Sequence, residues 1–264
     1  MDRLSIWQQN VNKSPSCQHN ILSNNHLIRE GINVIALQEP ALSGGGLTIS
    51  LRDWVSVYPM NHTSALLKTR SLTLIRANTS TKNWSQLDFP SSNITVTQIT
   101  RQWGKITIFN IYNDGENNKT IRLLTEYHRR NKAILERTLQ GEAHIIWLGD
   151  FNRHHSYWDS PEDTRLFTSE ATKAAEKLIE AVADVGLELV LPSSLPMHEH
   201  SVTKHWTRLN QVFLSEHASE MIISCNTKPE VRGINTDHLP ILTKLRLEVS
   251  ITEEEPIHNF RNVN

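Results

Sequence analysis

Two short polar clusters in this sequence have the residue types needed to hold a cation and to act on a phosphate ester. Gly149-Asp150-Phe151-Asn152 comes directly after the apolar run 145–148, and Thr236-Asp237-His238-Leu239-Pro240 lies near the end of the chain. Carboxylates ligate hard cations, and an imidazole donates to phosphate near neutral pH. Asp150 and Asn152 point the same way in an extended chain. Taken singly, each cluster also fits an ordinary turn, in which Gly, Asp and Asn are common.

Three upstream positions also place polar side chains where an apolar strand ends. Asn10 follows 4–9, Glu39 follows 34–38 and Tyr112 ends 106–112. A packed core gains nothing from acids and amides at such places, because burying a polar group without a partner is unfavourable. We therefore expect these three side chains to join the two clusters in one site.

Period-two alternation predicts the strands that must position these side chains. A stripe of apolar residues from Ala171 to Val182 predicts a helix, which Ser169 or Thr168 caps and Gly186 ends. Two further helices are expected at 17–30 and 119–139. Few helices lie between many strands, which favours two stacked sheets with helices outside over one doubly wound sheet. This pattern alone leaves both architectures open. The expected strands are 4–9, 34–38, 54–58, 72–76, 94–99, 106–112, 145–148, 187–191, 211–214 and 241–247.

Composition indicates one globular domain over 1–264, with a core at about 4–247 and a flexible tail at 248–264. Apolar residues make up 38% and charged residues 21% of the chain, and the net charge of -1 excludes a global basic field for nucleic acid. Cys17 and Cys225 share no short spacing, so we expect two reduced thiols. There is neither an apolar leader nor a run of about 18 apolar residues, so we expect an intracellular protein, nuclear or cytoplasmic, without a membrane contact.

Together the clusters resemble the endonuclease/exonuclease/phosphatase superfamily, and most of all the endonuclease domains of non-long-terminal-repeat retrotransposons. Leu37-Gln38-Glu39-Pro40, the Gly-Asp-Phe-Asn cluster and the terminal Asp-His cluster carry this resemblance. The extension Arg153-His154-His155 with Trp158 is more specific and points to the retrotransposon branch. The resemblance spans nearly the whole chain and implies a four-layer α/β sandwich of two mixed sheets flanked by helices.

The resemblance also implies a metal-dependent phosphodiesterase that uses Mg²⁺ or Mn²⁺. Glu39 would be the main metal ligand, helped by Asp237 and Asn10, and Asp150 would position or deprotonate the attacking water. His238 would stabilise the developing negative charge. Asn152 and Tyr112 would bind the scissile phosphate, and the substrate-binding residues would include Arg153, His154, His155 and Trp158.

One position departs from the family. Relatives usually carry an Asp just before the strand 211–214, where it orients the terminal histidine, and this chain has Asn210. Two functions therefore stay open. One is an active DNA endonuclease, with RNA as the alternative substrate and a monomer as the expected state. The other is a catalytically impaired remnant of a mobile element that at most binds nucleic acid. A small-molecule phosphatase with the same site residues is a further alternative.

A second possible metal site is weaker. His198, His200 and His205 have the side chains that bind transition metals, but they lie in a loop-like stretch without a cysteine. A solvated loop is the preferred interpretation of this segment.

Overall fold

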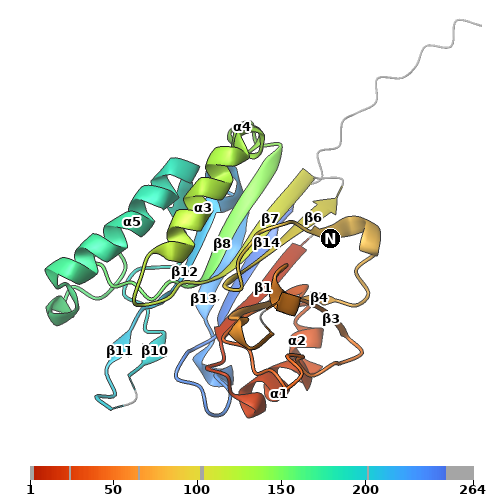
Figure 1. Ribbon diagram of the computed structural model, residues 1–264, viewed down its shortest axis with the longest axis horizontal. Helices are drawn as coiled ribbons and strands as arrows, with labels where there is room; N and C mark the ends of the chain where they lie inside the picture. The colour runs from red at the N-terminus through yellow and green to blue at the C-terminus, as the bar shows by residue number, and fades with distance from the viewer. Residues whose placement is uncertain (1–2, 24, 65, 102–103, 201, 248–264) are drawn as a thin grey trace, which may run out of the picture.

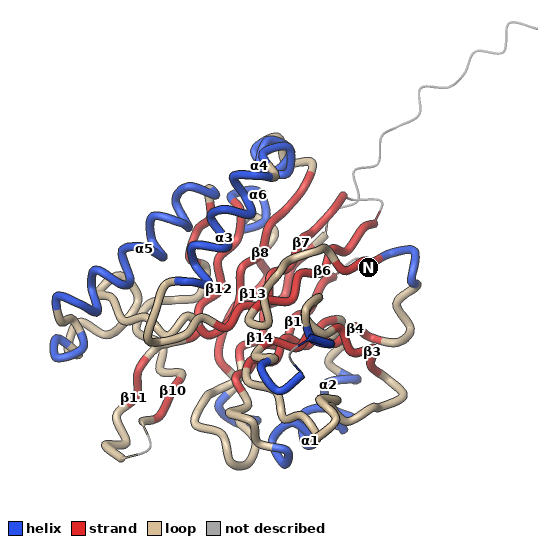
Figure 2. The backbone as a smooth tube through the Cα atoms, viewed as in Figure 1, coloured by secondary structure: helices blue, strands red, loops and turns tan. Residues whose placement is uncertain are grey.

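Two mixed sheets lie face to face in this protein, with helices covering both outer faces (Figures 1 and 2). The computed structural model describes residues 3–23, 25–64, 66–101, 104–200 and 202–247. Each sheet has six strands within these ranges, and a small hairpin projects from the sandwich. The four-layer α/β architecture predicted from sequence is confirmed. The expected tail at 248–264 lies outside the described residues.

The first sheet joins both ends of the described chain. Its order is β13-β14-β1-β2-β4-β3. β1 is parallel to β2 and antiparallel to β14, so the last strand lies beside the first. We propose on this ground that the described chain forms one domain. The strands are β1 (Arg3–Asn10), β2 (Val34–Gln38), β3 (Trp54–Val57), β4 (Ser71–Arg76), β13 (Ile222–Thr227) and β14 (Ile241–Arg246).

The second sheet repeats this plan around another parallel pair, β7 and β8. Its order is β5-β6-β7-β8-β12-β9, and the separate hairpin consists of β10 and β11. The strands are β5 (Trp84–Gln86), β6 (Ile94–Arg101), β7 (Gly104–Tyr112), β8 (Ala143–Asp150), β9 (Leu187–Leu189), β10 (His198–Glu199), β11 (Trp206–Thr207) and β12 (Asn210–Ser215).

The helices lie outside the sheets, with α1 and α2 on the first sheet and α3, α4 and α5 on the second (Figure 1). Among the described residues, none of them combines the length and the apolar character needed to cross a bilayer. The α-helices are α1 (Pro15–Ser23), α2 (Asn25–Arg29), α3 (Lys119–Arg130), α4 (Lys132–Leu139), α5 (Ser169–Val185) and α6 (Glu216–Ser219). The 3₁₀ turns are His62–Ser64, Leu66–Lys68, Thr81–Asn83, Thr164–Leu166 and Pro229–Val231.

Alternation along each strand separates three buried clusters. In β1, Ile6 faces the other sheet, whereas its neighbour Trp7 packs on the side of α1. In β8, Ile146 likewise lies between the sheets and Trp147 packs under α3 and α5. Successive side chains of a strand point to opposite faces, so one strand serves two layers. Both free cysteines, Cys17 and Cys225, are buried in these clusters.

Two of the predicted helices are each divided. The helix expected at 119–139 breaks at Asn131, whose φ of -111° and ψ of 47° are not helical. The Asn131 side chain donates to the carbonyl oxygen of Tyr127 at 2.8 Å and so competes with regular helix bonding. The helix expected at 17–30 starts earlier, at Pro15, and consists of α1 and α2. The strands β5, β10, β11 and β13 were not predicted.

Helix α5 has the predicted capping residues. The Thr168 hydroxyl accepts from the backbone N–H of Ala171, and Gly186 closes the helix at φ 70°. Replacing Thr168 by alanine leaves that N–H without its partner, so we expect the free energy of unfolding to fall by about 1 kcal/mol. Urea unfolding measures the change, with Ser169→Ala as the matched control at the neighbouring exposed position. Equal stability of the two variants would contradict the assignment of the cap.

Candidate active site

Strand register brings the predicted polar residues to one edge of the sandwich. In the parallel pair of β1 and β2, Asn10 lies opposite Gln38, so Glu39 follows at the same edge. In the second sheet, Tyr112 lies opposite Asp150, and Asn210 at the start of β12 lies opposite Asp150 on its other side. The terminal cluster joins them, because the Thr236 hydroxyl donates to the backbone oxygen of Asn10 at 3.0 Å.

Asn10 links two carboxylates. Its Nδ2 donates to Asp150 Oδ2 at 2.8 Å and lies 3.4 Å from Glu39 Oε2. Its Oδ1 accepts from the backbone N–H of Asn12 at 2.8 Å, so this oxygen already has a partner. The metal contact predicted for Asn10 stays a prediction, since an amide oxygen has a second lone pair. In this orientation the NH₂ group of Asn10 links the two carboxylates.

Glu39 has a cationic partner that the sequence did not reveal. Arg70 Nη1 pairs with Glu39 Oε1, and Lys13 Nζ lies 3.9 Å from the same oxygen. The Arg70 guanidinium also lies over the Tyr112 ring, 5.1 Å from its centroid. The Glu39 backbone has a φ of 46°, a left-handed conformation that is unusual for Glu. The backbone N–H of Glu39 donates to the Arg70 oxygen at 2.9 Å and holds this turn in place.

Asp150 is buried at the centre of the site. It accepts from Asn10 and from the backbone N–H of Asn152, the latter at 3.0 Å. Burial raises the pKa of Asp150 to about 6, although these hydrogen bonds act in the opposite direction. Asn152 has a φ of 47°, and its Nδ2 donates to the Asn113 oxygen at 2.8 Å. One N–H of that amide therefore remains for another acceptor.

Gly149 shows why the chain has glycine immediately before this aspartate. Its φ is 148°, and a Cβ atom built on it would lie 1.8 Å from the backbone oxygen of Ile111. Ile111 is the residue paired with Gly149 across the parallel strands. A side chain is excluded there because the neighbouring backbone occupies its place.

His238 has three polar neighbours. Its Nδ1 lies 2.8 Å from Asn210 Oδ1, which is the pairing predicted from sequence. Its Nε2 lies 3.7 Å from Asp237 Oδ1 and 3.8 Å from Asp150 Oδ2. Burial lowers the pKa of His238 to about 3, and the second histidine at 198 acts in the same direction. A hydrogen bond with that histidine lowers the pKa of Asp237 to about 2.

Two predicted substrate-binding residues are buried instead. The Arg153 guanidinium is bound by the turn 114–118, with contacts to the backbone oxygens of Asp114, Gly115 and Asn117. Trp158 is 1% exposed and donates through Nε1 to the Arg153 oxygen. Neither side chain can stack on a base or reach a phosphate, so these two predictions are wrong.

The other two predicted substrate-binding residues are half-buried. His154 Nδ1 lies 3.3 Å from Asp159 Oδ2, and His155 Nδ1 accepts from the backbone N–H of Tyr157 at 3.1 Å. These contacts fold the loop after β8. Substrate binding by either histidine stays a prediction.

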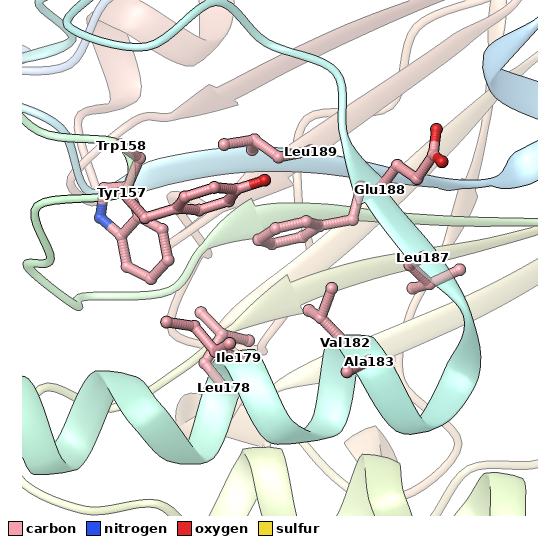
Figure 3. Close-up of a pocket in the computed structure, with 10 residues that line it drawn as sticks. Tyr157, Trp158, Leu178, Ile179, Val182, Ala183, Leu187, Glu188 and Leu189 are labelled. Carbon is pink, nitrogen blue, oxygen red and sulfur yellow. The ribbon is translucent and has the colours of Figure 1, made fainter.

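An apolar cavity of about 430 Å³ lies beside α5, away from the carboxylates (Figure 3). Tyr157 and Trp158 face Leu178, Ile179 and Val182 across it. Glu188 is its one charged lining residue among those that the structure describes. The cavity therefore lacks the groups needed for phosphate chemistry, and the candidate site is the polar cluster at the strand ends.

The donor atoms at the strand ends fit a hard divalent cation. Mg²⁺ and Mn²⁺ prefer carboxylate oxygens and keep several waters. Glu39 and Asp237 supply such oxygens, with 14% and 27% of their side chains exposed. Asp150 lies deeper, within hydrogen-bond distance of Asn10. The partial exposure of the first two leaves room for water or phosphate oxygens beside the cation.

Comparisons with known proteins give the same fold. The endonuclease domain of TRAS1, a telomere-specific non-LTR retrotransposon, aligns with a TM-score of 0.72 at 14% identity over 93% of this chain and 99% of that chain. The AP endonuclease LMAP from Leishmania major aligns with a TM-score of 0.70 at 15% identity, over 92% and 88%. The 3′ phosphatase NExo from Neisseria, bound to product DNA hairpin, aligns with a TM-score of 0.65 at 15% identity, over 92% and 99%.

The sequence itself carries a family assignment. A search of the curated proteins gave no match. Residues 106–242, more than half of the chain, match the family described as endonuclease-reverse transcriptase. This segment covers the second sheet from Ile106 in β7 onward, together with the Gly-Asp-Phe-Asn cluster and the terminal Asp-His cluster. The chain therefore belongs to the endonuclease-reverse transcriptase family, within the endonuclease/exonuclease/phosphatase superfamily of nucleases and phosphodiesterases.

Proposed function

We propose that this protein is a DNA endonuclease of the retrotransposon type that requires Mg²⁺ or Mn²⁺. The observation that carries the proposal is the meeting of Glu39, Asp150, Asp237 and His238 at one edge of two sheets, although they lie up to 199 positions apart in the chain. Three carboxylates beside an imidazole serve phosphodiester hydrolysis better than they serve a packed core. The DNA named with the NExo structure supports a nucleic-acid substrate.

The residues have separate roles in this proposal. Glu39 and Asp237 hold the cation, which supplies positive charge to the scissile phosphate when bound. Asp150 accepts a proton from the attacking water, since its raised pKa makes it a stronger base than an exposed carboxylate. Asn10 keeps Asp150 and Glu39 in position. The Tyr112 hydroxyl and the Asn152 amide donate to phosphate oxygens, and burial holds Tyr112 in its neutral form by raising its pKa to about 12.

His238 faces the two aspartates through Nε2 and takes part in stabilising the charge that develops on the phosphate. Asn210 orients its ring through Nδ1. This amide partner and the Arg70 pair on Glu39 also favour the second candidate, an impaired nuclease that binds nucleic acid without cutting it. Asn210 gives His238 no anionic partner, and Arg70 neutralises part of the negative charge that Glu39 offers to the cation.

A plasmid assay tests the proposal. We expect the purified protein to nick supercoiled plasmid with Mg²⁺ or Mn²⁺ and to stop when EDTA removes the cation, because Glu39 and Asp237 cannot supply positive charge themselves. A Glu39→Ala preparation made in parallel controls for contaminating nuclease. Cleavage that continues in EDTA would refute metal dependence. DNA binding without cleavage under all these conditions would support the impaired nuclease, and release of phosphate from small monoesters alone would support a phosphatase.

Arg70 is expected to compete with the cation for Glu39. A partly exposed ion pair contributes up to about 1 kcal/mol, so its removal should lower the Mg²⁺ concentration at half-maximal cleavage by up to about fivefold. Arg70→Met removes the charge and keeps an unbranched apolar chain over Tyr112. The measurement is a Mg²⁺ titration of cleavage, with Arg129→Met on the exposed face of α3 as the control. A higher Mg²⁺ requirement in Arg70→Met would show that Arg70 helps to hold the site in shape.

A further inference from the structure

A second histidine stands opposite His238, supplied by the projecting hairpin. His198 and His238 form an isolated antiparallel bridge. Two backbone hydrogen bonds flank it, from the Glu199 N–H to the Asp237 oxygen at 2.8 Å and from the Leu239 N–H to the Met197 oxygen at 2.7 Å. This is the non-hydrogen-bonded type of pair, in which opposite side chains approach most closely. The ring centroids of the two histidines are 4.7 Å apart.

The Nδ1 atom of each ring already has a partner. His198 Nδ1 lies 3.1 Å from Thr207 Oγ1, and that hydroxyl is oriented to donate to the His198 backbone oxygen at 3.5 Å. With the hydroxyl donating there, its oxygen can accept from Nδ1–H of the His198 ring. His238 Nδ1–H donates in the same way to Asn210 Oδ1 at 2.8 Å. In a neutral imidazole with the proton on Nδ1, Nε2 carries a free lone pair.

The Nε2 atoms of both rings lie close to the same carboxylate. His198 Nε2 lies 3.5 Å from Asp237 Oδ2, and His238 Nε2 lies 3.7 Å from Asp237 Oδ1. Either a proton on a ring nitrogen or a metal ion between the rings and the carboxylate satisfies these contacts, and a metal ion satisfies all three groups at once. A metal-binding histidine typically has its other ring nitrogen fixed by a hydrogen bond, as both of these do.

We propose that His198, Asp237 and His238 form a binding site for a transition-metal ion of the Zn²⁺ type. One ligand atom from each residue lies within 4.8 Å of the others. Tetrahedral Zn²⁺ with ligands at about 2.0–2.1 Å needs ligand atoms about 3.3 Å apart, so closure requires only small side-chain movements. Two imidazoles and one carboxylate suit Zn²⁺ or Co²⁺ and not Mg²⁺, which prefers oxygens.

The remaining histidines of the hairpin are not part of this site. His200 Nδ1 accepts from the backbone N–H groups of Val202 and Thr203, at 3.3 and 3.2 Å, and so closes the loop. His205 is exposed. The hairpin thus brings only His198 of these three histidines to the strand-end edge. The sequence had suggested a possible metal site formed by His198, His200 and His205 together.

This site shares Asp237 with the proposed Mg²⁺ site, which gives it a regulatory consequence that rests on the proposed function. A Zn²⁺ ion held by the two histidines occupies the carboxylate that the catalytic cation needs and engages His238 as well. Zn²⁺ should therefore inhibit cleavage in the presence of Mg²⁺.

Cobalt binding tests the site without any cleavage assay. Metal-free protein is titrated with Co²⁺, and the visible absorption of the bound ion is recorded. Zn²⁺ is then added, and it should displace Co²⁺ and abolish this absorption. We expect His198→Ala to weaken Co²⁺ binding by at least about tenfold, since the loss even of a group that supports a ligand costs 10- to 100-fold. His205→Ala in the same hairpin is the matched control and should bind as the wild type does. Unchanged Co²⁺ binding in His198→Ala would overturn the proposal.

Nitrogen NMR of the unmodified protein covers the case in which His198→Ala fails to fold. Zn²⁺ should shift the Nε2 signals of two histidines and leave their Nδ1–H groups in place. Signals that move only with pH and not with Zn²⁺ would show that a proton fills the space, and the proposal would be wrong. Absence of cleavage would refute the active nuclease, whereas the Co²⁺ titration and the NMR signals test the metal site independently of cleavage.

Discussion

Replacing Asp150 by asparagine is expected to reduce DNA cleavage by about 10³-fold, the middle of the range for loss of a general base. Asparagine has the same shape but no basic oxygen, so it cannot take a proton from water. The change also removes a buried charge that accepts from Asn10 at 2.8 Å and from the Asn152 N–H at 3.0 Å. These donors bind different carboxylate oxygens, so the amide oxygen can accept from only one of them in place. The fold should survive because both sheets are held by their own cores.

Single-turnover cleavage of plasmid at saturating Mg²⁺ measures this effect. Circular dichroism and a thermal melt establish that the variant is folded. Asp184→Asn is the matched control, since Asp184 is an exposed residue of α5. A folded Asp150→Asn protein that retains more than a tenth of the wild-type rate would show that another group accepts the proton.

The sequence predicted the strands whose apolar residues alternate or run together, and it missed those that do not. β8 is buried along its whole length and β7 along most of it, and both were found. β13 has two adjacent isoleucines followed by an exposed serine, which gives no period of two. β10 and β11 have two residues each and exist because of the hairpin, so local pattern could not indicate them.

The site was predicted in its residue types but not in its pairings. Side chains at strand ends could be expected to meet, because the ends of parallel strands share an edge. The partners Arg70 and His198 reach that edge through the register of β4 on β2 and through a hairpin bridge, which depend on contacts distant in sequence. Arg153 and Trp158 lie in a motif typical of the family, but a motif does not tell which of its side chains turn inward.

Asn210 occupies the position at which the family resemblance implies an aspartate. It is buried, its Oδ1 accepts from His238, and its Nδ2 has no hydrogen-bond partner among the described residues. An amide orients the ring but adds no charge to stabilise an imidazolium. Burial has already lowered the pKa of His238 to about 3, so the ring is neutral at pH 7. A carboxylate 2.8 Å away would raise that pKa.

We therefore expect Asn210→Asp to increase the cleavage rate by at least about tenfold, given that the corresponding change in a serine-protease triad costs about 10⁴-fold. With an ordinary imidazole pKa, most of this gain would appear above pH 7. With a pKa near 3 in the present protein, the gain should already be present at pH 6, because His238 is neutral there as well. Rates are measured at pH 6, 7 and 8, with Asn226→Asp on β13 as the control for an added charge.

Two results would contradict this expectation. Equal rates for Asn210→Asp and wild type at all three pH values would mean that cleavage does not use a charged His238. A lower rate in a folded variant would mean that a neutral ring is required. The second result would agree with a ring whose Nε2 binds a metal ion. The natural asparagine at position 210 would then be explained by the metal site of His198 and His238 and not by loss of function. Asn210 would then be the residue that keeps His238 available as a ligand.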